Sequence, residues 1–394
     1  MPRFTTLTLI LAAGLSLAAG SAMAQTVNWT TGTLGATQKV ADNLLNPLII
    51  SFGGNKIWKS NNPEIVKGAG WLMENSRADA TRGGVAYPLA GCTTAYMFHI
   101  NQIGSGAYLH LLASNPNNAT VTISAKGSMY NNSQKPLGGK GTGQSFAVSN
   151  DWIKNTFLTN FTGRAVNSLT ATEVAKVAMA NSNMVDGRFE ICASAPIYLY
   201  SVVTLTGTTN DAIAKSQGGP AAGEIHPSNT NAFGREAGVY ATSQVSGTTN
   251  VALPAAGKYA AFAFDTTKKL STTTQEQTAP AVMRLSDSSD ITAGNYGHKY
   301  DVTLHMTNPD PVAKKVRLSF ASSFTAATDK PSFTFNSSAT LNGSAVTLWT
   351  TPTQPKQVLA NWTVPANGVF DARLVTFIAG LGVTNQQLIL EVLP

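Results

Sequence analysis

The chain has 394 residues, of which 12% are Asp, Glu, Lys or Arg, and its formal net charge is +7. The basic residues are scattered, and the sequence lacks the basic stripe with interleaved aromatic side chains that nucleic-acid binding requires. We therefore exclude nucleic acid as a partner and expect a solvated surface rich in Thr, Ser, Asn and Gly. A positive balance of this kind favours contact with anionic envelope polymers.

The first 24 residues have the pattern of a secretory signal peptide. Arg3 precedes an apolar run over residues 7–19, and Ala22-Met23-Ala24 provides a small-residue cleavage site. A retained transmembrane anchor is the alternative, but the run is too short to span a bilayer comfortably. We predict a mature protein that begins at Gln25, has no transmembrane segment, and is secreted across the cytoplasmic membrane to the periplasm, the cell surface or the medium.

Strand patterns dominate the rest of the chain. Short segments of β-branched, aromatic and alternating apolar residues are separated by clusters of Gly, Asn, Pro and Ser. The clearest of them are residues 108–113, 120–125, 197–205, 259–264, 300–306, 316–320, 345–348 and 388–392. Such spacing predicts a mainly β fold class with two Ig-like antiparallel β-sandwich domains.

Helical patterns are confined to three places. Residues 36–45 and 151–160 carry apolar side chains at helical spacing, and Thr170-x-x-Glu173 has the pattern of a capping box. The last two lie between strands of the first half. We therefore expect a short helical insertion near residues 150–182 that covers one end of the first sandwich.

The domain organisation follows from composition. We predict a first sandwich over residues 25–215, a linker over residues 216–233 that is rich in Gly, Pro, Ala and Asn, and a second sandwich over residues 234–394. A strand, an Asn-Pro pair and a second strand occur in each half, at Asn115 and at Asn308. Because Asn-Pro suits the start of a tight turn, both segments are predicted to be hairpins. An internal duplication and a chance similarity both explain them.

Cys92 and Cys192 are the two cysteines of the chain. In an oxidising compartment we expect them to form one disulfide. The alternatives need more than the pair offers, because a metal site requires further ligands and a catalytic thiol requires an activating neighbour.

Sequence motifs of common enzymes are missing, and the five histidines have no metal-ligand spacing. We therefore assign no catalytic, cofactor-binding or metal-binding residue, and we favour a protein that is not an enzyme. Calcium is the one cofactor left open, because Asp287, Asp290 and Asp301 flank one loop. They lack the dense spacing of a calcium loop, which favours a solvated turn.

An ordered series of motifs is similar to an uncharacterised secreted family best known from cyanobacteria, over roughly residues 55–325. The insertion near residues 156–183 and the shorter C-terminal region depart from the family pattern. That family is a domain of unknown function, so the resemblance implies no catalytic residue. It does mark Arg235, Asn295, Tyr296 and His298 as candidate ligand-contacting or structural residues. The motifs are Ser60-Asn61-Asn62-Pro63-Glu64-Ile65-Val66, Gly70-Trp71-Leu72-Met73, Phe98-His99-Ile100-Asn101, Gly104-Ser105-Gly106, Asn115-Pro116, Ala195-Pro196-Ile197-Tyr198, Gly234-Arg235-Glu236-Ala237-Gly238-Val239 and Gly294-Asn295-Tyr296-Gly297-His298-Lys299-Tyr300.

Three hypotheses follow for function. The first is a non-catalytic binding or structural protein of the envelope, whose partner is an envelope polymer, a glycan or a protein at the cell surface. The second is a glycan-directed protein, either a carbohydrate-binding module or a secreted glycoside hydrolase. It needs exposed aromatic side chains on which sugars stack. The candidates for that role are Trp58, Trp71, Trp152, Trp349 and Trp362. The third is an assembly factor that lends or accepts a strand at a sheet edge. The oligomeric state stays open.

Overall fold

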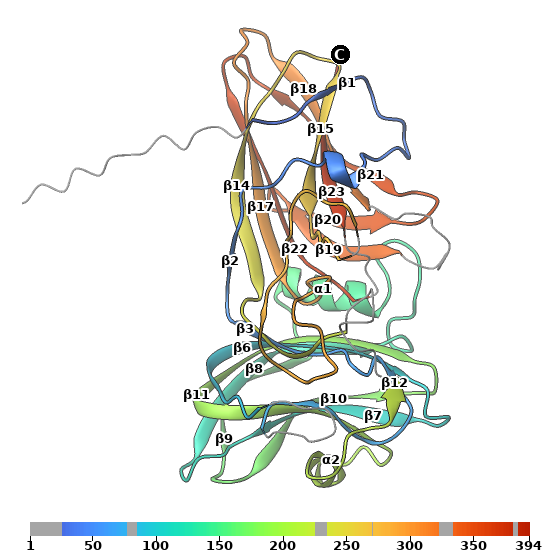
Figure 1. Ribbon diagram of the computed structural model, residues 1–394, viewed down its shortest axis with the longest axis vertical. Coiled ribbons are helices and arrows are strands. Elements are labelled where there is room, and N and C mark those ends of the chain that lie inside the picture. Colours follow the sequence, from blue (N-terminus) through green and yellow to red (C-terminus); the bar gives the residue numbers. More distant parts are fainter. Residues whose placement is uncertain (1–25, 77–84, 225–234, 270, 323–333, 381–384) are drawn as a thin grey trace, which may run out of the picture.

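The computed structural model describes residues 26–76, 85–224, 235–269, 271–322, 334–380 and 385–394. Two stacked bodies built almost entirely of strands make up the molecule (Figure 1). The predicted mainly β class is therefore confirmed. The expected signal peptide lies outside the described residues. Within those residues, no helix combines the length and the apolar character needed to cross a membrane.

The upper body in Figure 1 is a sandwich of a five-stranded and a six-stranded sheet. All of its strand pairs are antiparallel except β14 with β17, which run parallel. The five-stranded sheet has the order β1 (Thr30–Thr31), β15 (Lys258–Phe264), β23 (Gln386–Val392), β18 (Lys314–Ser322) and β21 (Lys356–Val364). The six-stranded sheet has the order β2 (Ser51–Gly53), β14 (Gln244–Ala252), β17 (Lys299–Thr307), β22 (Val369–Phe377), β19 (Phe335–Leu341) and β20 (Ser344–Thr350).

Alternation of side chains builds the core of this upper sandwich. Every second residue of β17 is buried and the residues between them are half-buried, because successive side chains of a strand point to opposite faces. Aromatic rings then connect the two sheets. Phe264 lies 4.7 Å from Tyr300 and 6.0 Å from Phe320, and Phe320 lies 5.1 Å from Phe335, measured between ring centroids.

The lower body depends on one long strand, β11 (Met184–Thr204). Its first half pairs with β6 (Leu89–Asn101) and β8 (Val121–Asn131), and its second half pairs with β5 (Gly70–Glu74) and β7 (Ala107–Ser114). The register shifts between Ala193 and Ile197, where the strand passes from one layer to the other. The remaining strands of this sheet are β3 (Lys56–Ser60), β4 (Ile65–Val66), β9 (Thr159–Val166), β10 (Ala171–Met179), β12 (Gly223–Glu224), β13 (Ala237–Tyr240) and β16 (Ala281–Arg284).

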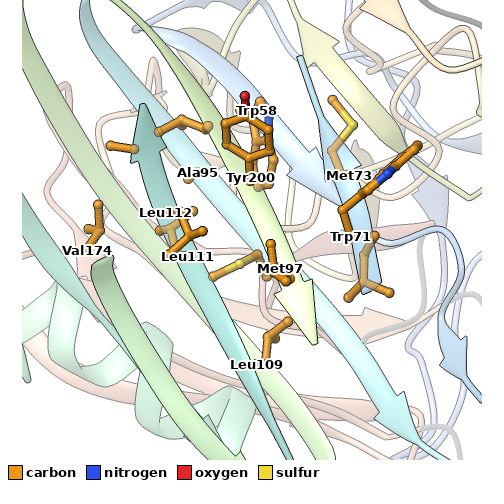
Figure 2. Packing of buried hydrophobic residues seen from close by; sticks show 14 of the residues in the cluster. Trp58, Trp71, Met73, Ala95, Met97, Leu109, Leu111, Leu112, Val174 and Tyr200 are labelled. Atoms are coloured by element: carbon orange, nitrogen blue, oxygen red, sulfur yellow. The ribbon is translucent and has the colours of Figure 1, made fainter. Parts of the chain in front are cut away.

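Both layers of the lower body bury their inner faces in one hydrophobic cluster. Figure 2 shows side chains from β3, β5, β6, β7, β10 and β11 within it. Trp58 and Trp71 are fully buried there, beside Met73, Met97 and Leu111. Deep burial of this kind explains why apolar residues run almost continuously through β5 and β7 rather than in strict alternation.

The chain passes between the two bodies several times, whereas a single linker predicts one passage. The N-terminal strands β1 and β2 pair with β15 and β14 of the upper sandwich. In the other direction, β13 and β16 extend the lower sheet, because β13 pairs with β3 and with β16. The boundary at residues 216–233 stays a prediction, and part of it lies outside the described residues.

The helices differ from those expected. The helix α1 (Gln144–Lys154) begins before residue 151, and α2 (Thr209–Ser216) lies at the end of the first predicted sandwich, where no helix was expected. Residues 36–45 contain only the short 3₁₀ turn η1 (Asp42–Leu44). The capping-box helix is wrong: Thr170 instead bonds to the Asn167 carbonyl, and residues 171–179 form β10. Pairing of β10 with β7 decided this, since tertiary contacts override local propensity.

The two Asn-Pro segments are corners and not hairpins. The strands on either side, β7 with β8 and β17 with β18, do not pair, and each corner carries the chain from one layer of its sandwich to the other. The amide of Asn115 donates to the carbonyls of Ala119 and Val166, and that of Asn308 donates to the carbonyls of Val312 and Pro365, all within 2.9 Å. Each asparagine therefore joins its turn to a distant strand end in the same way.

The predicted disulfide is confirmed. Cys92 and Cys192 are directly opposite each other on β6 and β11, with Cα atoms 3.9 Å apart and a sequence separation of 100 residues. The bond therefore fixes the register of the longest strand in the fold. Cys92 is exposed and Cys192 is half-buried, so the bond faces solvent.

Removing this bond is expected to destabilise the protein. In the chain-entropy model, a closed loop of this length contributes about 4–5 kcal/mol to the free energy of unfolding. Denaturant unfolding of a Cys92→Ser, Cys192→Ser double variant measures the loss. Added reductant should destabilise the wild type by a similar amount and leave the variant unchanged; a variant as stable as the wild type would contradict the prediction.

The corner asparagines provide a second prediction. Asn115→Ala or Asn308→Ala removes a buried amide that donates to backbone carbonyls of the corner, and we expect this loss to cost about 1–3 kcal/mol. Asn361→Ala, on an exposed position of β21, is the matched control and should change stability little. Chemical denaturation of the three variants compares them directly, and equal losses in all three would argue against the structural role of the corners.

Candidate functional site

The residues marked by the last two motifs gather at the junction between the two bodies. Asn295, Tyr296 and His298 lie between β16 and β17, and Arg235 precedes β13. Tyr296 stacks on Tyr96 of the lower sandwich, with ring centroids 6.3 Å apart. The Arg235 guanidinium lies 3.0 Å from the carboxylate of Glu64. The structure thus brings all four residues to one interface, although they come from separate segments.

Asn295 is the centre of a buried hydrogen-bond network. Its Nδ2 amide donates to Asp265 Oδ1 at 3.1 Å, to the Tyr300 hydroxyl at 2.8 Å and to the carbonyl of Gln277. Its Oδ1 accepts from the Thr292 hydroxyl at 2.5 Å. Every polar atom of this side chain is therefore used inside the fold, which indicates a structural role.

Next to this network lies a buried ion pair that the sequence analysis missed. Lys59 Nζ is 3.1 Å from Glu236 Oε2, and the two side chains are 0% and 1% exposed. The rings of Tyr96 and Tyr240 enclose the amine, each with its centroid 5.8 Å from Nζ. A single signal was available in the sequence: a lysine directly after two large apolar residues, in Ile57-Trp58-Lys59.

A second charged group of the junction lies on β11. Asp186 and Arg188 are two residues apart on one strand, so both point to the same face. The Arg188 guanidinium carbon lies 3.9 Å from the ring centroid of Trp152, and its Nε donates to the Gly297 carbonyl at 2.6 Å. Asp186 Oδ2 accepts from the backbone N–H of Gly380 at 2.9 Å. These contacts tie the lower sheet to loops of the upper sandwich.

Burial shifts the pKa values of the junction strongly. It raises the pKa of Asp265 to about 8 and that of Asp186 to about 6, and it lowers the pKa of Arg188 to about 9. Burial also lowers the pKa of His298 well below its usual value, and the charges of Lys59 and Arg188 lower it further. Perturbed groups of this kind mark functional sites only when a substrate reaches them. These side chains are sealed between two bodies, which indicates that they hold the two bodies together and do not contact a substrate.

Two histidines have neighbours that resemble a catalytic triad. Nδ1 of His110 donates to Glu173 at 2.7 Å and its Nε2 accepts from the Thr204 hydroxyl at 2.9 Å. Nδ1 of His99 donates to the Pro63 carbonyl at 2.8 Å, and its Nε2 lies 2.9 Å from the Ser60 hydroxyl. The histidines and both hydroxyl groups are fully buried. A nucleophile must reach its substrate, so both sets stabilise strands instead.

The tryptophans do not form a sugar-stacking platform within the described residues. Trp58 and Trp71 are core residues, and Trp152 packs between Phe157 and Phe377. Trp362 lies against Phe370 at the edge of the upper core, with ring centroids 4.9 Å apart, and Trp349 is half-buried on β20. These tryptophan side chains therefore contribute to packing rather than to an exposed aromatic surface.

The aspartates considered for calcium do not form a cluster. Asp301 is held by Arg373 at 2.7 Å and by Lys299 at 3.2 Å. Among the residues that the structure describes, no three His, Cys, Asp or Glu side chains gather in a metal-binding arrangement.

A pocket of about 430 Å³ lies beside the disulfide. Asn55, Lys56 at the start of β3, Tyr87 and Cys92 are among the residues that line it. In the described part of the chain, the side chains of Asn55, Lys56 and Tyr87 have no hydrogen-bond or ion-pair partner. Three unpaired polar groups around one concave surface make this pocket the best candidate for an external ligand.

A family model described as "Protein of unknown function (DUF3370)" matches residues 159–344, slightly less than half of the chain. This agrees with the resemblance to an uncharacterised domain family, and the matched segment includes the motifs around Arg235 and Asn295. The cyanobacterial link stays a prediction. No curated protein matches the chain.

Solved structures offer only distant likenesses. The N-terminal CBM22-1-CBM22-2 tandem domain from Paenibacillus barcinonensis Xyn10C is 8% identical, with 83% of this chain and 91% of that chain covered and a TM-score of 0.18. The CUB1-EGF-CUB2 domain of human MASP-1/3 is 8% identical, with 82% and 99% covered and a TM-score of 0.17. A Paenibacillus xanthan lyase is 10% identical, with 82% and 26% covered and a TM-score of 0.16. Scores this low carry no argument about function.

The buried carboxyl groups lead to a prediction about pH. Between about pH 4 and pH 8 folded Asp265 keeps a proton that the unfolded chain has lost, so this group makes stability fall as pH rises. We expect Asp265→Asn to flatten that fall, as measured by denaturant unfolding across this range.

The matched control for this experiment is Asp301→Asn. The hydrogen bond from Arg373 lowers the pKa of Asp301, so its contribution has the opposite sign: it is present above the ordinary pKa and is lost in acid. The control variant should lose stability at neutral pH and keep the wild-type slope between about pH 5 and pH 8. The same slope in Asp265→Asn as in the wild type would contradict the prediction.

Proposed function

We propose that the mature chain is a secreted, non-catalytic protein of the cell envelope that acts by binding or by forming surface structure. The observation that carries the proposal is that side chains able to act as a catalytic base or nucleophile are buried and bonded to other residues of the fold. His99, His110 and Lys59 are all 0% exposed and have partners within 3.1 Å. A base or nucleophile that no substrate reaches contributes to stability and not to turnover.

Export is supported by the exposed disulfide. Because Cys92 faces solvent, thiols can attack the disulfide. In the reducing cytosol such an accessible disulfide would be reduced to two free thiols. An oxidising compartment, reached through cleavage of residues 1–24, is therefore part of the proposal. The partner is an envelope polymer or a protein at the cell surface.

Glycan binding at the pocket is the second candidate function. The Lys56 amine suits a carboxylate, because hydrogen bonds between charged partners are strong. The Asn55 amide has the donors and the acceptor that sugar hydroxyls need, and the Tyr87 ring offers an apolar face. Together these three side chains support an acidic saccharide as the ligand. The tryptophans do not add to this support, because they form no exposed platform for sugar rings within the described residues.

Thermal unfolding with a panel of acidic and neutral polysaccharides tests both candidates. A ligand that binds only the folded state adds about 2.7 kcal/mol of stability at one hundred times its Kd. We expect acidic polysaccharides to raise the Tm of the mature protein, and we expect Lys56→Ala and Tyr87→Ala to reduce that rise.

Lys315→Ala, on an exposed position of β18, removes the same charge away from the pocket and should keep the full rise. An equal loss in this control would mean general charge attraction and would contradict the pocket. Release of new reducing ends from any polysaccharide would contradict the non-catalytic proposal. A Tm that no polymer changes would argue against glycan binding and favour a protein partner.

A further inference from the structure

The Lys59 amine lies in a desolvated site at the junction, in direct contact with a carboxyl group. It is completely buried, and within the described residues its hydrogen-bond partner is Glu236 alone, although an ammonium carries three N–H donors. Burial lowers the pKa of Lys59, and the charge of Glu236 offsets part of this effect. A desolvated lysine with a lowered pKa is the usual form of a reactive amine in proteins.

The Glu236 carboxyl is held in place to receive that amine. Gly238 pairs with Lys59 in the ladder between β13 and β3, and Asn61 N–H donates to the Glu236 carbonyl at 2.7 Å. The Ala293 backbone N–H donates to Glu236 Oε1 at 2.8 Å, while Oε2 faces Lys59 Nζ at 3.1 Å. The ladder therefore fixes both reactants, and a backbone donor polarises the carboxyl group.

Burial of both charges favours a neutral product. Burial also raises the pKa of Asp265, whose carboxyl group acts electrostatically on Lys59, to about 8, so this neighbouring carboxyl is protonated at neutral pH. Two ions sealed between the bodies carry a large desolvation penalty. An amide and a released water molecule carry no charge, so the reaction removes that penalty.

We propose that Lys59 and Glu236 are joined by an intramolecular isopeptide bond. A proton first passes from Nζ to Oε2, which leaves a neutral amine beside a neutral carboxyl group. The nitrogen lone pair then attacks Cδ, and the C–N bond forms while the Ala293 N–H stabilises the charge on Oε1. The C–Oε2 bond breaks, and Oε2 leaves with a second proton from nitrogen as water. No oxidant, reductant or cofactor takes part.

The bond would join two segments that are 177 residues apart in the sequence. It closes a second covalent loop that spans the disulfide loop and includes most of the lower sandwich. A cross-link of this kind withstands reductants, which the exposed disulfide does not. It thus gives an extracellular protein a permanent fastening at the junction.

Mass spectrometry of the purified mature protein tests the proposal. We expect the intact mass, after reduction, to be lower than the sequence mass by one water molecule. A tryptic digest should lack cleavage after Lys59 and should contain a branched peptide that joins Lys59 to Glu236. The exposed pair of Lys67 and Glu224, 2.7 Å apart, is the internal control and should be cleaved normally after Lys67.

Variants separate the bond from the ion pair. Lys59→Arg keeps the cation but removes the nucleophilic amine, so its mass should equal its sequence mass, whereas Lys67→Arg should retain the loss of water. The wild-type measurement needs no variant to fold. A wild-type mass without the loss of water, together with tryptic cleavage after Lys59, would overturn the proposal and leave an ordinary buried ion pair.

Discussion

The cost of burying charge at the junction constrains the rest of this structure. Lys59, Glu236, Asp186, Arg188 and Asp265 are sealed between the two bodies. Loss of one partner of a buried pair leaves an unpaired charge, at a cost on the order of 3–5 kcal/mol. Each ionisable group of the junction therefore needs a fixed neighbour, whether through a hydrogen bond, an ion pair or the proposed bond between Lys59 and Glu236, and these neighbours come from both sandwiches. The junction can form only when both bodies are folded and docked in one orientation.

Exchange of strands reinforces that docking. The chain enters the upper sandwich with β1 and β2, builds the lower one, and returns to the upper one after β13 has joined the lower sheet. The helix α1 fills the space between the bodies, and Ser149 on it accepts a hydrogen bond from the Ser338 backbone of β19 (Figure 1). The two sandwiches are therefore held together by strand pairing, packing and buried polar contacts.

The distribution of reactive groups separates stability from recognition. His99, His110, Trp58 and Trp71 lie in the interior, where they add hydrogen bonds and apolar area. The polar side chains of Asn55, Lys56 and Tyr87 instead line a pocket beside the exposed disulfide, where solvent reaches them. Groups at a concave surface that solvent reaches can contact an external ligand, whereas the buried histidines cannot.

The sequence alone determined the fold class, the eight clearest strands and the disulfide, because alternation of side chains is a local pattern and two cysteines allow only one intramolecular pairing. It also marked Arg235, Asn295, Tyr296 and His298 as a set. Only the tertiary structure decided that Thr170-x-x-Glu173 starts a strand, that the Asn-Pro segments are corners, and that Lys59 meets Glu236. Those outcomes depend on contacts between residues far apart in the chain. A local sequence pattern does not identify which distant residue will be the partner.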